Sequence, residues 1–217
     1  MKSLLNKEIR LWASPLAWIF LAGALMTMLP GYPILVGSFF VCFGVFQSFQ
    51  SGREQNDTLY SVLLPVAKRD VVRARYCFTV LIQAIGFVLM AALTALRMTA
   101  LADAAPYVTN AMMNATPYYL ACALLIFTAF NVFFVGGFYK TAYNIGWPFL
   151  RYGISSLVLI ALAEVAHHLP WLTFLNNPAG ERVGVQLALL VIAAIVYAGL
   201  TMLSCRASMR RFERTDL

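Results

Sequence analysis

Charged residues are scarce in this sequence of 217 residues. They make up 12% of the chain, against 61% apolar residues, and the mean hydropathy is +0.76. A soluble globular domain carries about 25% charged residues, because its water-facing surface is built largely from charge. The shortage argues against an ordinary soluble domain and predicts an integral membrane protein.

Closely spaced cysteines and the signatures of enzyme active sites are missing as well. The four cysteines lie far apart without a CxxC pair, which argues against a zinc site and a disulfide framework. No phosphate-binding GxxxxGK[ST] loop, HExxH helix or GxSxG turn occurs. We therefore expect no catalytic, metal-binding or cofactor-binding residue on this chain.

Long apolar runs are abundant instead. A helix needs about 20 mostly apolar residues to cross a bilayer. The stretches that meet this requirement are residues 11–29, 32–49, 76–96, 117–138, 145–166 and 183–203. The expected fold class is all-α integral membrane, with one transmembrane domain over residues 1–217 and six transmembrane helices.

Basic residues are distributed unevenly around these spans. If both termini are cytoplasmic, only Arg97 and Arg182 of the 16 Lys and Arg residues face outward. Cytoplasmic loops retain an excess of basic residues, so the pattern predicts cytoplasmic N and C termini in the inner (cytoplasmic) membrane of the cell. The net charge of +7 lies in short runs between apolar stretches. It therefore indicates an anionic lipid bilayer as partner, and no nucleic acid.

Two segments outside the spans resemble membrane-surface segments. Apolar residues between Leu4 and Trp12 recur near helical spacing, which predicts an N-terminal interfacial helix that turns into the first span. The alternative is the frayed start of that span. Residues 167–182 are apolar and aromatic for a loop, so we expect an outer re-entrant or interfacial segment there.

Polar residues inside the spans must face protein or a water-filled cavity. Hydrogen bonding between helices is the default interpretation. Lining of a transport pathway is the alternative for Gln47, Asn131, Ser155 and Glu164. Glu164 and His168 share a helical face at the outer mouth, beside His167, which would suit a proton or metal site. Such a pair without a third ligand is more typical of a helix end that reaches the surface.

The longest segment outside the spans is the loop of residues 50–75. It is too short to fold alone as a catalytic domain. Its acidic start, apolar patch and basic second half predict a short helix that Asp57 begins and Pro65 ends, followed by a second helix from Lys68 into the third span. The apolar patch needs a covering surface, which is a partner protein or, alternatively, the membrane.

This loop carries its residues in a recognisable order. The order is Glu54, Asp57, Leu64-Pro65-Val66, Arg69, Val71-Val72 and Arg75-Tyr76. With these residues and six spans, the chain resembles the membrane (permease) subunits of ABC transporters of the type-two export class. It is similar to the small six-span group whose ATPase is encoded separately. One departure is Ala67, where relatives usually have a Ser or Thr that caps the next helix.

The resemblance implies that the loop is a coupling helix that docks on a cytoplasmic ABC ATPase subunit, with ATP and Mg²⁺ bound on that partner. It implies two ATPase copies and a second permease, either another copy of this chain or a paralogue. This chain would form the translocation pathway and would not be an enzyme. The docking candidates are Glu54, Asp57, Leu59, Leu63, Leu64, Pro65, Val66, Lys68, Arg69, Asp70 and Arg73.

The expected function is therefore ATP-driven export by this transmembrane permease subunit. Its apolar spans and outer segment suit an amphipathic or hydrophobic cargo, such as a peptide, drug or lipid-like molecule. One alternative is a membrane-embedded lipid-modifying enzyme, with Glu164 and His168 at its site. Another is a non-transporting sensory or immunity partner, which would bind an ATPase without moving a substrate.

Overall fold

The computed structural model describes residues 2–57, 60–61, 66–141, 144–177 and 182–214, and all regular structure within these ranges is helical. The first half contains α1 (Lys2–Lys7), the π-helical turn η1 (Glu8–Trp12), α2 (Pro15–Ile19), the 3₁₀ segment η2 (Phe20–Met28), α3 (Val36–Glu54) and α5 (Lys68–Thr99). The second half contains α6 (Ala105–Val108), α7 (Pro117–Ala129), the π-helical segment η3 (Phe130–Val135), α8 (Gly136–Phe138), α9 (Gly146–Ala166), η4 (Thr173–Asn176) and α10 (Val183–Glu213).

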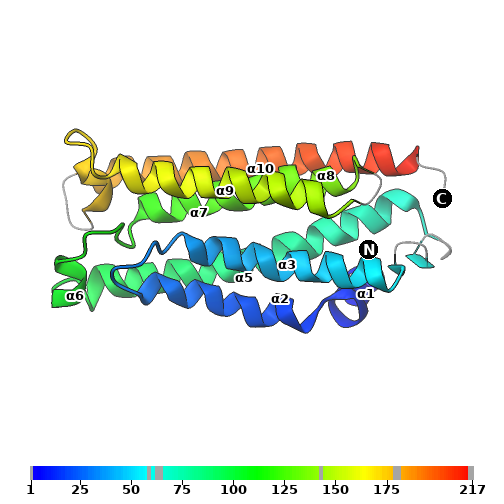
Figure 1. Ribbon diagram of the computed structural model, residues 1–217, viewed down its shortest axis with the longest axis horizontal. Coiled ribbons are helices and arrows are strands. Elements are labelled where there is room, and N and C mark those ends of the chain that lie inside the picture. The colour runs from blue at the N-terminus through cyan, green and yellow to red at the C-terminus, as the bar shows by residue number, and fades with distance from the viewer. Residues whose placement is uncertain (1, 58–59, 62–65, 142–143, 178–181, 215–217) are drawn as a thin grey trace.

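The long helices lie side by side in an elongated bundle (Figure 1). The start of α1 and the end of α10 lie at the same end, which we call the terminal end, whereas α6 and η4 lie at the opposite, far end. The long helices α3, α5, Pro117–Phe138, α9 and α10 alternate in direction along the chain (Figure 1). In the packing, α7 contacts α10, and η2 contacts both α3 and α5.

Polar side chains mark where several helices begin. Ser14 Oγ accepts a hydrogen bond from Leu16 N at 3.3 Å, with Pro15 in the first turn of α2. Thr116 caps α7 in the same way through Tyr119 N. At α5, Ala67 provides no side-chain cap, as its identity predicts, and the helix begins at Lys68 without one.

The centre of the bundle is the helix formed by α7, η3 and α8, which together cover Pro117–Phe138. In its most apolar stretch 78% of the residues are buried, against 11% in α10. Aromatic rings fill the space around it: Phe134 packs on Phe46 and Phe49, with ring centroids 5.4 and 5.1 Å apart. The outer face of α10 is instead apolar and exposed, as expected of a helix that faces lipid.

Within the described residues, four helices are long and apolar enough to cross a membrane: α5, Pro117–Phe138, α9 and α10. A fifth candidate combines Leu4–Trp12 with Pro15–Met28, two helices that meet at a bend of 92°. The predicted second span, α3, is not among them, because its second half carries Gln47, Gln50 and Arg53. The structure thus gives four or five candidate spans where the sequence predicts six.

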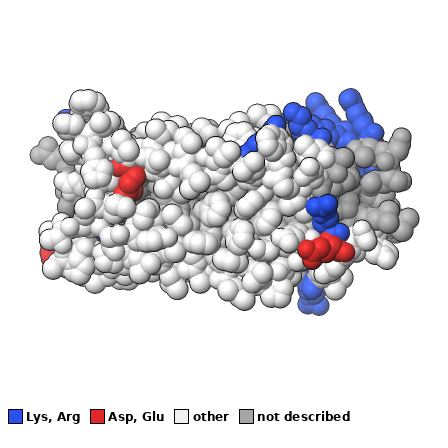
Figure 2. Space-filling model, viewed as in Figure 1, with Lys and Arg blue, Asp and Glu red and all other residues white. Residues whose placement is uncertain are grey.

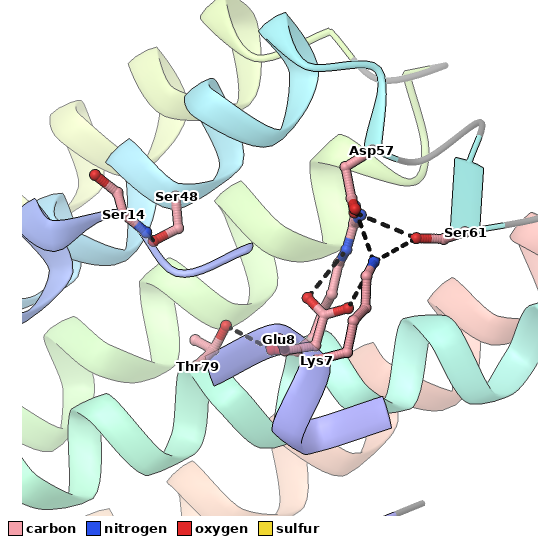
Figure 3. A network of polar contacts seen from close by, with 8 residues as sticks. Lys7, Glu8, Ser14, Ser48, Asp57, Ser61 and Thr79 are labelled. Atoms are coloured by element: carbon pink, nitrogen blue, oxygen red, sulfur yellow. Dashed lines mark hydrogen bonds and ion pairs between the residues drawn. The ribbon is translucent and has the colours of Figure 1, made fainter. Parts of the chain in front are cut away.

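Two local expectations concern α5 and the N-terminal helix. The helix predicted to start near Lys68 and enter the third span is confirmed, since α5 runs from Lys68 to Thr99 without a break. The expected turn after the N-terminal helix is present as the 92° bend between Leu4–Trp12 and Pro15–Met28, whereas an interfacial position of that helix stays a prediction. Ser14 N donates a hydrogen bond to Ser48 Oγ at 2.9 Å, which fixes this turn to α3 (Figure 3).

Candidate functional site: the 50–75 segment and its buried ion pairs

Charge is concentrated at the ends of the bundle. On the face shown in Figure 2, Lys and Arg gather at the terminal end, and the long middle of the surface is almost free of charge. A belt without charge is what the hydrocarbon core of a bilayer requires. Chemistry that depends on charge is therefore confined to the two ends.

Four charged side chains meet at the terminal end, where the N-terminal helix, the 50–75 segment and α5 converge (Figure 3). Lys7 Nζ donates to Asp57 Oδ1 at 2.7 Å, and Arg75 Nη2 donates to Asp57 Oδ2 at 2.6 Å. Glu8 completes the group, with its carboxylate oxygens 3.5 Å from Lys7 Nζ and 3.7 Å from Arg75 Nε. We call Lys7, Glu8, Asp57 and Arg75 the ion quartet; its formal charges sum to zero.

The ion quartet is mostly buried. The side chains of Arg75 and Glu8 are 2% and 1% exposed, and the Arg75 guanidinium lies 4.9 Å from the centre of the Trp12 ring. Ser61 Oγ accepts from Lys7 Nζ at 2.6 Å and donates to Asp57 Oδ2 at 3.3 Å. Removal of one partner of a buried ion pair leaves an uncompensated charge. The ion quartet therefore fixes the position of the 50–75 segment relative to the N-terminal helix and α5.

The protonation state of Asp57 follows from these contacts. Burial raises the pKa of Asp57, but the hydrogen bond from Lys7 and the positive charge of Arg75 outweigh it, so the pKa lies below the usual value of an aspartate. Asp57 is therefore ionised at neutral pH, and it holds Lys7 and Arg75 together.

The segment has an inner and an outer face. Asn56 has a positive φ of 53°, which reverses the chain after α3. Asp57, Tyr60 and Ser61 that follow are helical. Asp57 and Ser61 face the ion quartet, whereas Tyr60 is 65% exposed. The acid predicted to face a partner thus binds this chain's own cations.

The other predicted docking residues fall into three groups. Glu54, Arg69 and Arg73 are exposed, and Lys68 and Asp70 are partly exposed. Val66 is partly buried and packs on the core. Leu59, Leu63, Leu64 and Pro65 lie outside the described residues, so the predicted apolar patch stays a prediction.

A second polar group lies inside the bundle and connects α5, η3 and α10. Gln83 and Asn131 exchange two hydrogen bonds of 3.0 Å through their side-chain amides. Asn131 Nδ2 also donates to Thr201 Oγ1 at 2.9 Å, and Tyr197 OH donates to Gln83 Oε1 at 2.8 Å. Dispersion forces between apolar helices do not by themselves fix how the helices are aligned along their axes. Hydrogen bonds between the helices fix that alignment.

The π-helical geometry of η3 exposes an additional acceptor in this group. A π-helix shifts backbone hydrogen bonds from i−4 to i−5 and so leaves carbonyls available to side chains. The carbonyl of Asn131 accepts from Ser204 Oγ at 2.9 Å and from Tyr76 OH at 3.4 Å. The bulge is thereby fixed to both α5 and α10.

The four predicted pathway residues are not brought together. Asn131 is fully buried in the group just described, and Ser155 Oγ bonds to Tyr152 O of its own helix at 2.9 Å. Gln47 and Glu164 are partly exposed. No hydrogen bond joins any two of the four within the described residues, and their role in a pathway stays a prediction.

At the far end, Glu164 of α9 binds the backbone of the loop that precedes α7. Its Oε1 accepts from Met113 N at 2.8 Å and lies 3.5 Å from His167 Nε2. Helical spacing would pair Glu164 with His168, but α9 ends at Ala166 and the chain leaves the helix there. No group of three metal-binding side chains occurs in the described part of the chain.

Arg97, near the end of α5, also lies at the far end. It donates to Thr27 O at 2.6 Å and to Asn114 Oδ1 at 3.0 Å, and its guanidinium lies 4.1 Å from the centre of the Tyr107 ring. No carboxylate among the described residues pairs with it. It borders a cleft of about 380 Å³ together with Asn176.

Comparison with known families decides which kind of membrane protein this is. The model of a family described as ABC-2 family transporter protein matches residues 3–213, nearly the whole chain. This chain belongs to the ABC-2 transporter family. It is a multi-pass membrane protein and a permease component of an ABC transporter, of a family that generally works with a cytoplasmic ATPase subunit. Searches of curated proteins and of solved structures found no match.

The ABC-2 permease also contains functional candidates that the sequence pattern did not single out. Lys7 and Glu8 join Arg75 in the ion quartet, yet in the sequence they read as ordinary charges of an interfacial helix. The negative charge of Glu8 could have indicated its role, because Glu8 is the single acidic residue among the first 50. A lone acid in a basic, membrane-near segment requires a partner.

Proposed function

We propose that this ABC-2 permease is the transmembrane subunit of an ATP-driven exporter. ATP and Mg²⁺ are bound on a separate cytoplasmic ATPase, and the outer face of the 50–75 segment docks on that ATPase. The observation that carries this proposal is the division of the segment between Asp57, held inside by Lys7 and Arg75, and Tyr60 and Arg69, which face out. A segment held on one face and open on the other can transmit force from a partner.

The proposed topology has six spans with both termini in the cytoplasm. In the bundle, α3 packs on η2 and α5 and runs in the opposite direction to both (Figure 1). Its polar second half points to the terminal end, where Lys and Arg gather. The excess of basic residues there supports a cytoplasmic location for that end.

The proposed coupling runs through the ion quartet. Closure of the ATPase pair moves the docked segment, and Asp57 passes this movement to Arg75 on α5 and to Lys7 on the N-terminal helix. Helix α5 is 32 residues long, so it extends about 48 Å as one rigid element to the far end. The inward-to-outward change of the spans then follows from a tilt of α5.

The proposed working unit contains two ATPases and two permeases, the second permease being a copy of this chain or a paralogue. The proposed cargo is amphipathic or hydrophobic: a peptide, drug or lipid-like molecule. The support is the exposed apolar surface of the bundle and of the outer segment, where Trp171 is exposed beside η4.

Co-purification with the neighbouring ATPase tests the docking proposal. Arg69→Glu reverses an exposed charge on the segment and is expected to abolish co-purification. Arg182→Glu makes the same change at an exposed site of the far end and is expected to have no effect. Full retention of the ATPase by Arg69→Glu would contradict the proposal. ATP-dependent cargo movement in vesicles separates an exporter from a partner that binds the ATPase without transport.

A further inference from the structure

A cleft of about 410 Å³ lies at the terminal end, between η3, α8, the start of α9 and the last third of α10. Three cationic side chains from three different elements line it: Lys140, Arg151 and Arg211. All three are exposed. None belongs to the ion quartet, and none is a predicted docking residue.

The other wall of the cleft is apolar. Val132 and Phe133 of η3 face it together with Leu200 and Leu203 of α10. These residues lie in helices that are apolar enough to cross a membrane. Along the bundle axis the apolar residues lie closer to the middle than Lys140 and Arg211, because the η3–α8 segment and α10 both run toward the terminal end in Figure 1. From Leu200 to Arg211 the distance along the axis is about 16 Å.

The cations in the cleft repel one another, and the cleft itself offers no acid. None of the described residues that line it is Asp or Glu. Arg211 Nη1 donates to the carbonyl of Gly136 at 3.4 Å, and the Arg151 guanidinium lies 5.4 Å from the centre of the Trp147 ring. Neither Lys140 nor Arg151 forms an ion pair within the described part of the chain. The charges of Lys140 and Arg151, which no described acid neutralises, favour an anion in the cleft, where Arg211 can also contact it.

We propose that this cleft binds an anionic phospholipid, with the headgroup phosphate between Lys140, Arg151 and Arg211 and an acyl chain along Phe133 and Leu203. The apolar wall favours a lipid over a free anion, because a soluble anion has no acyl chain to pack against that wall. Basic pockets between membrane helices on the cytoplasmic side suit such headgroups. The leaflet is the cytoplasmic one in the proposed topology; the site itself does not depend on ATPase docking.

The bound lipid connects parts of the bundle that the ion quartet does not reach. The ion quartet joins the N-terminal helix, the 50–75 segment and α5, whereas the cleft joins η3, α8, α9 and α10. An anionic lipid therefore stabilises the second half of the bundle. Its effect on thermal stability is separable from any effect on the docking segment.

Native mass spectrometry of the purified full chain in neutral detergent tests the site, with phosphatidylglycerol and phosphatidylcholine as probes. We expect phosphatidylglycerol to bind at least tenfold more tightly. One cation near the surface contributes about fivefold, so Lys140→Gln and Arg151→Gln should each weaken phosphatidylglycerol binding by about that factor. Lys140→Arg should retain it. Arg206→Gln is the matched control, because Arg206 is an exposed cation of α10 outside the cleft.

Four outcomes would overturn the lipid site. The first is equal binding of the two lipids. The second is a loss in Arg206→Gln as large as in Lys140→Gln. The third is displacement of phosphatidylglycerol by millimolar inorganic phosphate, which would identify a site for free anions. ATPase co-purification with the Lys140→Gln and Arg151→Gln variants is expected to be unchanged. Loss of the ATPase with lipid binding intact would assign the cations to that partner and also overturn the lipid site.

Discussion

Two arginines on α5, Arg75 and Arg97, show how differently the two ends of the bundle are built. Both are buried, at 1% and 4% exposure. Arg75 lies at the terminal end between the carboxylates of Asp57 and Glu8. Arg97 lies at the far end, where its partners are the Thr27 carbonyl, the Asn114 amide and the Tyr107 ring.

The difference shows which end depends on complete charge pairing. At the terminal end, loss of one charge leaves opposite charges buried beside it, and that cost is large. At the far end, loss of Arg97 leaves only neutral dipoles, which cost less to leave unpaired. The buried arginine of the terminal end is therefore held by ion pairs, and that of the far end is held by hydrogen bonds to neutral groups.

The largest expected effect is a contrast between Arg75→Met and Arg97→Met. Arg75→Met should lower the free energy of unfolding by about 3–5 kcal/mol, because Glu8 and Asp57 then share only Lys7. Arg97→Met should lower it by about 1–3 kcal/mol, the cost of lost hydrogen bonds at a buried site. Unfolding by SDS in mixed micelles measures both. Equal losses would remove the distinction between the two ends.

Acid should affect the terminal end through Asp57. The pKa of Asp57 is lowered in the folded protein, so its contribution to stability is present above the unfolded pKa of about 3.9. It is lost as the pH falls through the still lower folded pKa. The stability difference between the wild type and Asp57→Asn should be constant near neutral pH and shrink below about pH 4. A difference that disappears already between pH 7 and pH 5 would contradict the assigned shift.

The smallest effect is expected at Gln83, which lies between the two arginines on the same helix. Gln83→Met removes the amide pair with Asn131 and the bond from Tyr197. Hydrogen bonds between membrane helices contribute about 0.6 kcal/mol on average, so the variant should lose about 1–2 kcal/mol in the same SDS titration. A loss as large as that of Arg75→Met would show that charge pairing is not what sets the terminal end apart.

Sequence reasoning predicted the elements whose signal is local. The start of α5 at Lys68 could be predicted because Pro65 cannot continue a helix, and the residues from Lys68 lead without another proline into an apolar run. The bend after Trp12 follows similarly from a short amphipathic stretch before Pro15. Helix α3 is the element whose assignment as a span stays a prediction, since Gln47, Gln50 and Arg53 make its second half polar.

The ion quartet could not be predicted, because its members come from residues 7, 8, 57 and 75. In the sequence each of them looks like an ordinary charged residue of a loop or an interfacial helix. Only tertiary packing brings the four side chains together. The π-helical segment η3 is also without a sequence signal: FNVFFV is uniformly apolar apart from Asn131. At the far end, helical spacing does not extend to His168, because α9 ends at Ala166.

Site-specific photo-crosslinking in the assembled transporter tests the proposed coupling most directly. A photoreactive residue replaces Tyr60, on the outer face of the 50–75 segment, or Val108, at the far end; both positions are 65% exposed. The account predicts that the residue at 60 crosslinks to the ATPase subunit and the residue at 108 does not. A residue at 60 that crosslinks only to lipid, or to the ATPase no more than the residue at 108, would contradict it.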